Sequence, residues 1–204
     1  MIESAQRAAA LTAGRSLRIV SKRGHVLECS LEGAKIDDAG RPARLPGEVA
    51  YLSGQISFYP EAASIQGTLQ VDGLITPVGR LENPIELDFR DGVVVEIRGG
   101  SQATDLRDWM SGDPSAWLQH LAHLSLGAIP GLGITAQPVL SERAYGAVVA
   151  GFGAQPPGLG IFPEVPAQAT THWDAITMGS EIRIDGRVIL PEEERIDECT
   201  ENVL

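Results

Sequence analysis

Short apolar segments separated by turns fill the chain between residues 49 and 100. In order they are VAYLSGQISFYP, IQGTLQVDGLI, NPIELDFRDG and VVVEIRGG. Apolar and polar residues alternate within them, and they contain two Asp-Gly pairs, which is typical of antiparallel strands joined by tight turns. Because alternation leaves one apolar face on each strand, we predict that this half of the chain is mostly sheet.

The same pattern recurs nearer the two ends of the chain. Residues 15–33, RSLRIVSKRGHVLECSLEG, alternate on both sides of KRGH, and residues 181–190, EIRIDGRVIL, contain another Asp-Gly pair. Both segments predict hairpins. Residues 142–155, ERAYGAVVAGFGAQ, contain an apolar run that indicates a buried strand.

Helices are predicted in two places. Residues 3–13 are rich in residues with a high helix propensity. The composition of residues 104–126 also favours a helix. The second stretch is interrupted by a Gly-Asp-Pro run, where the Asp-Pro pair could begin a new helix. We therefore predict an α+β fold with a mainly antiparallel curved β-sheet and a few flanking helices. Residues 1–190 are expected to form a single domain and residues 191–204 an acidic C-terminal tail.

Composition excludes several classes of function. The 204 residues carry a formal net charge of -11, which argues against a surface for nucleic acid or anionic lipid. No apolar run is long enough to cross a bilayer, and the N-terminus lacks the pattern of a signal peptide, so a cytoplasmic location is expected. Cys29 and Cys199 are far apart and lack CxxC spacing, so we expect neither a disulfide framework nor a cysteine metal site.

Three of the four histidines fall in the first two thirds of the chain. His25 lies in a predicted turn beside basic residues and is interpreted as a solvated side chain. His120 and His123 are three residues apart on the predicted helix, where they would be neighbours. On this spacing alone, one is interpreted as a core residue and the other as a surface residue.

The fourth histidine precedes an aspartate by two residues. If residues 171–175 are extended, His172 and Asp174 point to the same side of the strand, and Trp173 points to the other side, into the core. This pair and one remote histidine would form the two-histidine, one-carboxylate set that binds ferrous iron and leaves coordination positions open. Alternatively, Asp174 only orients His172 through a hydrogen bond.

Three segments in a fixed order carry a resemblance to known families. HLSLGAIPG, GAVVAGFG and THWDAITMGSEIRIDG resemble the C-terminal catalytic region shared by 2,5-dihydroxypyridine 5,6-dioxygenases and thermophilic metallo-aminopeptidases of the aminopeptidase T type. The resemblance runs from about residue 45 to residue 190 and implies a catalytic-type metal-binding domain. In the dioxygenase branch one iron is bound, and the matching ligands here are His123, His172 and Asp174. The peptidase branch binds two metal ions, with Glu in the slot of His123 and His in the slot near Val149.

The sequence matches the dioxygenase pattern. The resemblance therefore implies an Fe(II)-dependent oxygenase that cleaves a small hydroxylated aromatic or heteroaromatic ring in the extradiol manner, with dioxygen as its second substrate. Glu61 corresponds to another peptidase ligand position. It is interpreted either as a polar residue at the pocket rim or as a catalytic residue that takes a proton from the substrate or holds the HxD histidine.

Two other functions remain compatible with the sequence. One is an aminopeptidase-like metallohydrolase, in which a metal-activated water attacks the substrate and Glu61 acts as the base. The other is a non-catalytic subunit that retains the fold.

The families named above carry an additional N-terminal domain that helps to close the substrate pocket. We expect another element to replace that wall here, because a small ring should be largely buried when bound. The loops at residues 128–142 and 154–171 are rich in Pro, Gly and apolar residues. We predict a homo-oligomer held partly through residues 154–169.

Overall fold

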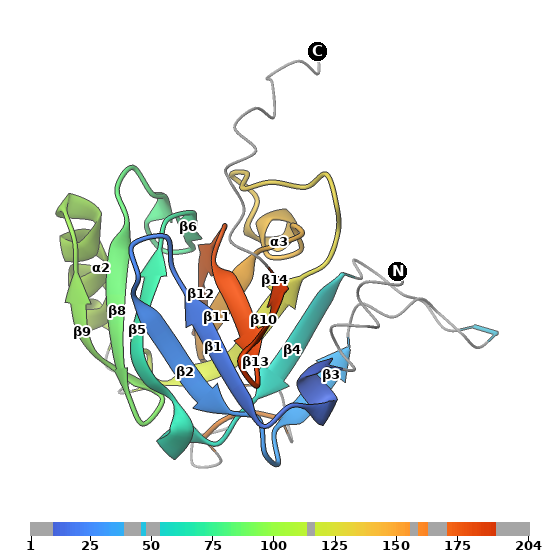
Figure 1. Ribbon diagram of the computed structural model, residues 1–204. Helices are drawn as coiled ribbons and strands as arrows, with labels where there is room; N and C mark the ends of the chain where they lie inside the picture. The colour runs from blue at the N-terminus through green and yellow to red at the C-terminus, as the bar shows by residue number, and fades with distance from the viewer. Residues whose placement is uncertain are drawn as a thin grey trace.

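The structure is a computed structural model that describes residues 10–38, 46–47, 54–113, 117–155, 159–162 and 171–190. Within these residues the strands form two antiparallel sheets of seven strands each. The sheets lie face to face, with β1, β2 and β13 of one sheet in front of β10, β11 and β12 of the other in Figure 1. The predicted fold class is confirmed.

We refer to the two sheets as sheet A and sheet B. In spatial order, sheet A contains β14 (Arg187–Leu190), β13 (Glu181–Ile184), β1 (Ser16–Val20), β2 (Val26–Ser30), β5 (Gln66–Val71), β8 (Ile85–Arg90) and β9 (Val93–Arg98). Sheet B contains β3 (Lys35–Asp38), β4 (Gln55–Tyr59), β10 (Leu121–Gly127), β11 (Val148–Gly153), β12 (His172–Thr177), β6 (Leu74–Ile75) and β7 (Gly79–Arg80).

The hairpins form where the sequence predicts them. β1 pairs with β2, β8 with β9, and β13 with β14. Asp91 and Asp185 both have positive φ angles, of 52° and 50°, and each is followed by a glycine that also has a positive φ. Two consecutive positive φ angles are what a two-residue hairpin turn of type I′ requires, and Asp-Gly adopts them readily.

The helical segments are few. They comprise residues 10–13, η1 (Ala62–Ser64), α2 (Ser101–Gly112) and α3 (Pro138–Ser141). α2 flanks β9 at one side of the molecule (Figure 1). The predicted helix at residues 3–13 is confirmed for residues 10–13, and its other residues lie outside the described part, as does the predicted tail at 191–204. None of the described helices is both long and apolar enough to cross a membrane.

The prediction of a helix up to residue 126 is wrong. α2 ends at Gly112, and residues 121–127 form strand β10, which pairs with β4 on one side and β11 on the other. The segment LAHLSL is a short apolar run, and such a run fits a buried strand as well as a buried helix. Residues 121–127 form a strand because they pair with a strand on each side. His120 and His123 are therefore not neighbours on a helix.

The core lies between the two sheets. Trp173 of β12 is 1% exposed and stacks on Phe152 of β11, with ring centroids 4.1 Å apart. Its indole nitrogen donates a hydrogen bond to the backbone oxygen of Leu118 at 2.9 Å. The predicted core position of Trp173 is confirmed. Because side chains alternate along a strand, His172 and Asp174 point to the opposite, outer face of sheet B.

Candidate metal centre

Three adjacent strands bring the candidate ligands together on the outer face of sheet B. His123 of β10 pairs with Gly151 of β11, and Gly151 pairs in turn with Asp174 of β12. His172 lies two residues before Asp174 on the same strand and so shares its face. Residues from positions 123, 172 and 174 therefore meet over the middle strand.

The distances among these side chains are short. One candidate ligand atom from each of His123, His172 and Asp174 lies within 4.8 Å of the other two. The Asp174 Oδ1 atom is 3.3 Å from Nε2 of His172 and 3.8 Å from Nε2 of His123. The two imidazole rings are nearly parallel, with centroids 5.4 Å apart. Both Nε2 atoms and the carboxylate thus converge on one point.

Gly151 provides the space for this convergence. A Cβ atom at this position would lie 2.2 Å from Nε2 of His123, which is far closer than atoms can approach. The imidazole of His123 therefore lies directly over the Gly151 backbone. A glycine on the middle strand lets the side chains of its two neighbours reach each other across it.

Each histidine is held through its other ring nitrogen. Nδ1 of His172 is 2.8 Å from the backbone oxygen of Ala154, and Nδ1 of His123 is 2.9 Å from Oγ of Ser125. A carbonyl oxygen only accepts hydrogen bonds, so Nδ1 of His172 carries a proton and donates it. In neutral His172 the free electron pair is then on Nε2, the atom that faces the site.

The two histidines differ in their electrostatics. Burial lowers the pKa of His123 to about 4, although the charge of Asp174 opposes this shift. Burial also acts to lower the pKa of His172, but the hydrogen bond and charge of Asp174 outweigh it, so that this pKa is raised. At neutral pH His123 is therefore uncharged. A metal ion at Nε2 of His172 would have to displace a proton, so its binding would strengthen as the pH rises.

This donor set suits a divalent cation. Two imidazole nitrogens and a carboxylate converge at this site. Without a metal ion, a proton on Nε2 of His172 can lie between that nitrogen and Oδ1 of Asp174, which are 3.3 Å apart, and a divalent cation can take the place of this proton. The Nδ1 atoms of His123 and His172 are held by hydrogen bonds, as is usual for histidines that bind metals. The residues present therefore fit a mononuclear metal ion.

Glu142 is a further acidic group beside this site that sequence reasoning missed. It follows α3, its side chain is 14% exposed, and its carboxylate is 3.3 Å from Arg143 Nη1. Burial and the charge of Asp174 raise the pKa of Glu142 to about 7, against the effect of Arg143. A carboxyl group that titrates near neutral pH can exchange protons with a substrate. Only the folded loop brings it close, so no local sequence pattern indicates it.

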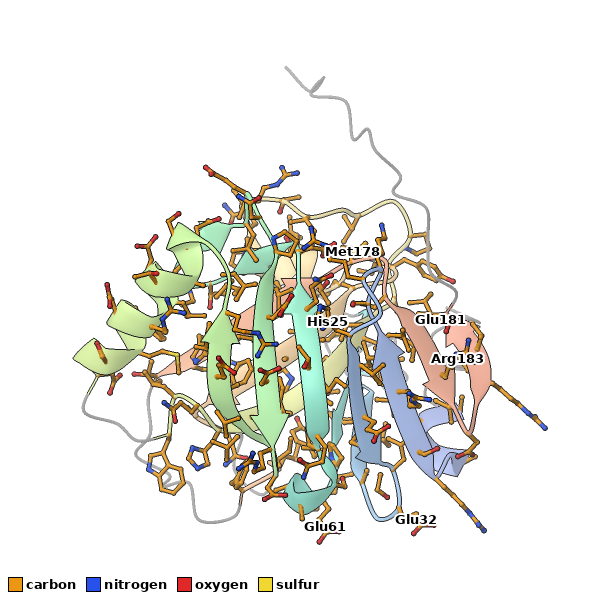
Figure 2. The ribbon with its side chains drawn as sticks, turned by 60° about the vertical axis from the view of Figure 1, so that its left-hand side comes forward. His25, Glu32, Glu61, Met178, Glu181 and Arg183 are labelled. Carbon is orange, nitrogen blue, oxygen red and sulfur yellow. The ribbon has the colours of Figure 1, made fainter. Side chains whose placement is uncertain are left out.

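The structure leaves the other sequence-derived candidates apart from this cluster. Glu61 is exposed at the start of η1, where its side chain makes no capping hydrogen bond, and Figure 2 shows it at one outer end of the molecule. Its catalytic role stays a prediction. His120 packs against the rings of Trp117 and Phe162, each at 4.8 Å.

Two further residues also lie away from the site. His25 is 3.1 Å from Glu86 at the surface of sheet A. Cys29 is buried in the core, where burial and the charge of Glu28 raise its pKa to about 12. Neither contributes a ligand to the cluster.

Comparison with known families agrees with the resemblance seen in the sequence. A family model described as NicX, 2,5-dihydroxypyridine 5,6-dioxygenase, matches residues 2–139. The matched segment includes His123 and ends before His172 and Asp174. No curated protein matches the sequence of the chain.

Two solved structures share the fold. The structure of 2,5-dihydroxypyridine dioxygenase from Pseudomonas putida KT2440 superposes with a TM-score of 0.72 at 22% identity, over 93% of this chain and 57% of that chain. Wild-type AmpT from Thermus thermophilus superposes with a TM-score of 0.64 at 18% identity, over 89% of this chain and 49% of that chain. The chain thus spans about half the length of these two proteins.

Proposed function

The chain belongs to the NicX family, described as 2,5-dihydroxypyridine 5,6-dioxygenase, and from this membership we propose that it is a mononuclear Fe(II)-dependent dioxygenase. The proposed substrate is a small hydroxylated aromatic or heteroaromatic ring, which is opened in the extradiol manner. His123, His172 and Asp174 are the proposed ligands. Residues 1–190 would act as one catalytic domain.

The observation that carries this proposal is the convergence of the three donors over Gly151. Two-histidine, one-carboxylate sets with open positions are typical of non-haem iron oxygenases. His123 contributes a neutral imidazole, because burial holds its pKa at about 4. A neutral imidazole has the free electron pair that a metal ligand needs.

The protein groups hold the reactants and move protons. When bound by such a set, ferrous iron offers open positions at which a hydroxylated ring and dioxygen can meet. A carboxylate then accepts the proton that a ring hydroxyl gives up. Glu142 is proposed for this role because of its raised pKa and its electrostatic coupling to Asp174 and His172. Glu61 is the second candidate, from the resemblance alone, because its exposed side chain lies apart from the three donors. Their Gln variants separate the two in the assay described below.

A two-metal hydrolase is less well supported. The resemblance to aminopeptidases would place a further ligand near Val149, but this side chain is fully buried and packs with Leu74, Ala144, Ala147 and Ile176. An apolar cluster provides no ligand atom for a second metal ion. We therefore propose the oxygenase and treat the hydrolase as the outcome that the assay must exclude.

A second copy of the chain is proposed to complete the pocket. Residues 156–158 and 163–170 of the predicted contact segment lie outside the described residues. The homo-oligomer therefore stays a prediction.

Oxygen uptake provides the test of this function. Chain loaded with Fe(II) under anaerobic conditions is mixed with 2,5-dihydroxypyridine, and separately with catechol, in air-saturated buffer. Both atoms of dioxygen are incorporated into the ring-opened product. We therefore expect that, with at least one of the two compounds, the moles of dioxygen consumed equal the moles of ring compound lost, as measured by its absorbance. The matched control is Asp174→Asn loaded in the same way.

Peptidase activity would identify the alternative function. Release of amino acids from aminoacyl p-nitroanilides with Zn(II) or Co(II), without oxygen uptake, would contradict the oxygenase proposal and support the hydrolase.

A further inference from the structure

A pair of serines, one of them fully buried, lies beside His123 on the outer face of sheet B. Ser125 of β10 is fully buried and pairs directly with Ser57 of β4. The two hydroxyl oxygens are 2.8 Å apart, and the Ser125 oxygen is 2.9 Å from Nδ1 of His123. An unbroken hydrogen-bonded row therefore runs from β4 to the imidazole.

The direction of this row decides which nitrogen of His123 can bind a metal. A serine hydroxyl has one proton to donate. If Ser125 donates to Ser57, it accepts a hydrogen bond from Nδ1–H of His123, and the electron pair is left on Nε2. If Ser125 instead donates to Nδ1, the proton of neutral His123 sits on Nε2, and that atom cannot be a ligand.

The position of the ring favours the first direction. Nε2 of His123 lies over Gly151 and 3.8 Å from Oδ1 of Asp174, where the three donors meet. If Nε2 is a metal ligand it carries no proton, so the proton of the neutral ring is on Nδ1 and is donated to Ser125. Ser57, whose hydroxyl oxygen is 2.8 Å away, is then the acceptor for the Ser125 hydroxyl.

His172 shows the same arrangement with a fixed partner. Its Nδ1 faces the backbone oxygen of Ala154, which cannot reverse its role. The hydroxyl beside His123 can reverse, so this ligand needs a second group to set its direction. Ser57 can set this direction because its hydroxyl oxygen is 2.8 Å from that of Ser125.

We propose that Ser125, backed by Ser57, is the positioning residue that keeps His123 protonated on Nδ1 and holds its Nε2 over Gly151 toward Asp174. Neither serine is one of the three donors of the candidate metal centre. Both the hydrogen-bond direction and its consequence for metal affinity rest on the proposed function.

Nitrogen-15 spectra of the metal-free full-length chain test the direction. The chain has four histidines, and comparison with His123→Ala assigns the His123 signals. We expect protonated Nδ1 and unprotonated Nε2 in the unmodified chain at pH 8. Ser57→Ala should give a mixture of the two tautomers, because Ser125 is then free to donate to Nδ1. A signal from protonated Nε2 as the main form of the unmodified chain would overturn the proposal.

Metal affinity tests the consequence. Removing a group that orients a metal-binding histidine typically weakens binding by about 10-fold to 100-fold, so we expect a loss of this size for Co(II) in Ser125→Ala. Ser57→Ala should lose less. The control is Thr68→Val, which removes a hydroxyl that donates to Asp88 at 2.6 Å on sheet A and should bind Co(II) as the unmodified chain does. Circular dichroism confirms that each variant is folded.

Different results would contradict the role of Ser125 and the presence of a metal centre. Unchanged Co(II) affinity and an unchanged tautomer in Ser125→Ala would overturn the positioning role. If the unmodified chain binds no divalent metal ion at all, the proposed function fails, and the tautomer spectra still decide the hydrogen-bond direction.

Discussion

Replacing His123 with alanine is expected to abolish iron retention, whereas replacing His120 leaves it intact. His123 is one of three donors within 4.8 Å of one another, and removing a ligand should weaken binding beyond the ~10-fold to 100-fold loss that an orienting group causes. His120 is the matched control because it lies only three residues away but packs against Trp117 and Phe162.

The measurement is iron content after anaerobic loading and desalting. We expect no iron above background in His123→Ala and the unmodified content in His120→Ala. Loss of iron from His120→Ala with retention in His123→Ala would show that the assignment of the ligand on this segment is wrong.

Replacing Gly151 with alanine is expected to have a comparable effect through a single methyl group. The new carbon would lie 2.2 Å from Nε2 of His123, so the imidazole must leave its position facing Asp174. The Gly151 backbone is not among those with positive φ, so alanine should not strain the strand. The fold should therefore survive while the metal site is lost.

Gly133→Ala is the control for this change. A Cβ there meets no atom within 4 Å, and its φ is also not positive. We expect wild-type iron content in Gly133→Ala and none above background in Gly151→Ala, with both variants folded by circular dichroism. Full iron retention by Gly151→Ala would contradict the position of His123 over the middle strand.

Local sequence patterns were sufficient to predict the hairpins and two of the three candidate ligands. Alternation in β8, β9, β13 and β14 depends on neighbours in sequence, and Asp-Gly pairs mark the turns with their own φ preferences. The His172–Asp174 pair was equally local, because residues two apart on a strand share a face. These features could be predicted without knowledge of the partner strands.

The identity of β10 as a strand and the contacts of His123 depend on pairing between segments that are distant in the sequence. The apolar run at residues 121–127 is so short that it is compatible with a strand or a helix. It forms a strand because it pairs with β4 and β11. The same register sets Gly151 between His123 and Asp174 and places Ser57 beside Ser125. No spacing within the sequence indicates these contacts, since they arise from how four strands align.

Iron content of the unmodified chain tests whether His123, His172 and Asp174 form a metal centre. The chain is purified without oxygen, loaded with excess Fe(II), desalted and analysed for all transition metals. A set of two histidines and one carboxylate binds a single ion, so the account predicts about one iron per chain. Two metal ions per chain would show that ligands beyond His123, His172 and Asp174 are present and would support a hydrolase. No retained metal would contradict a metal centre on this face of the sheet.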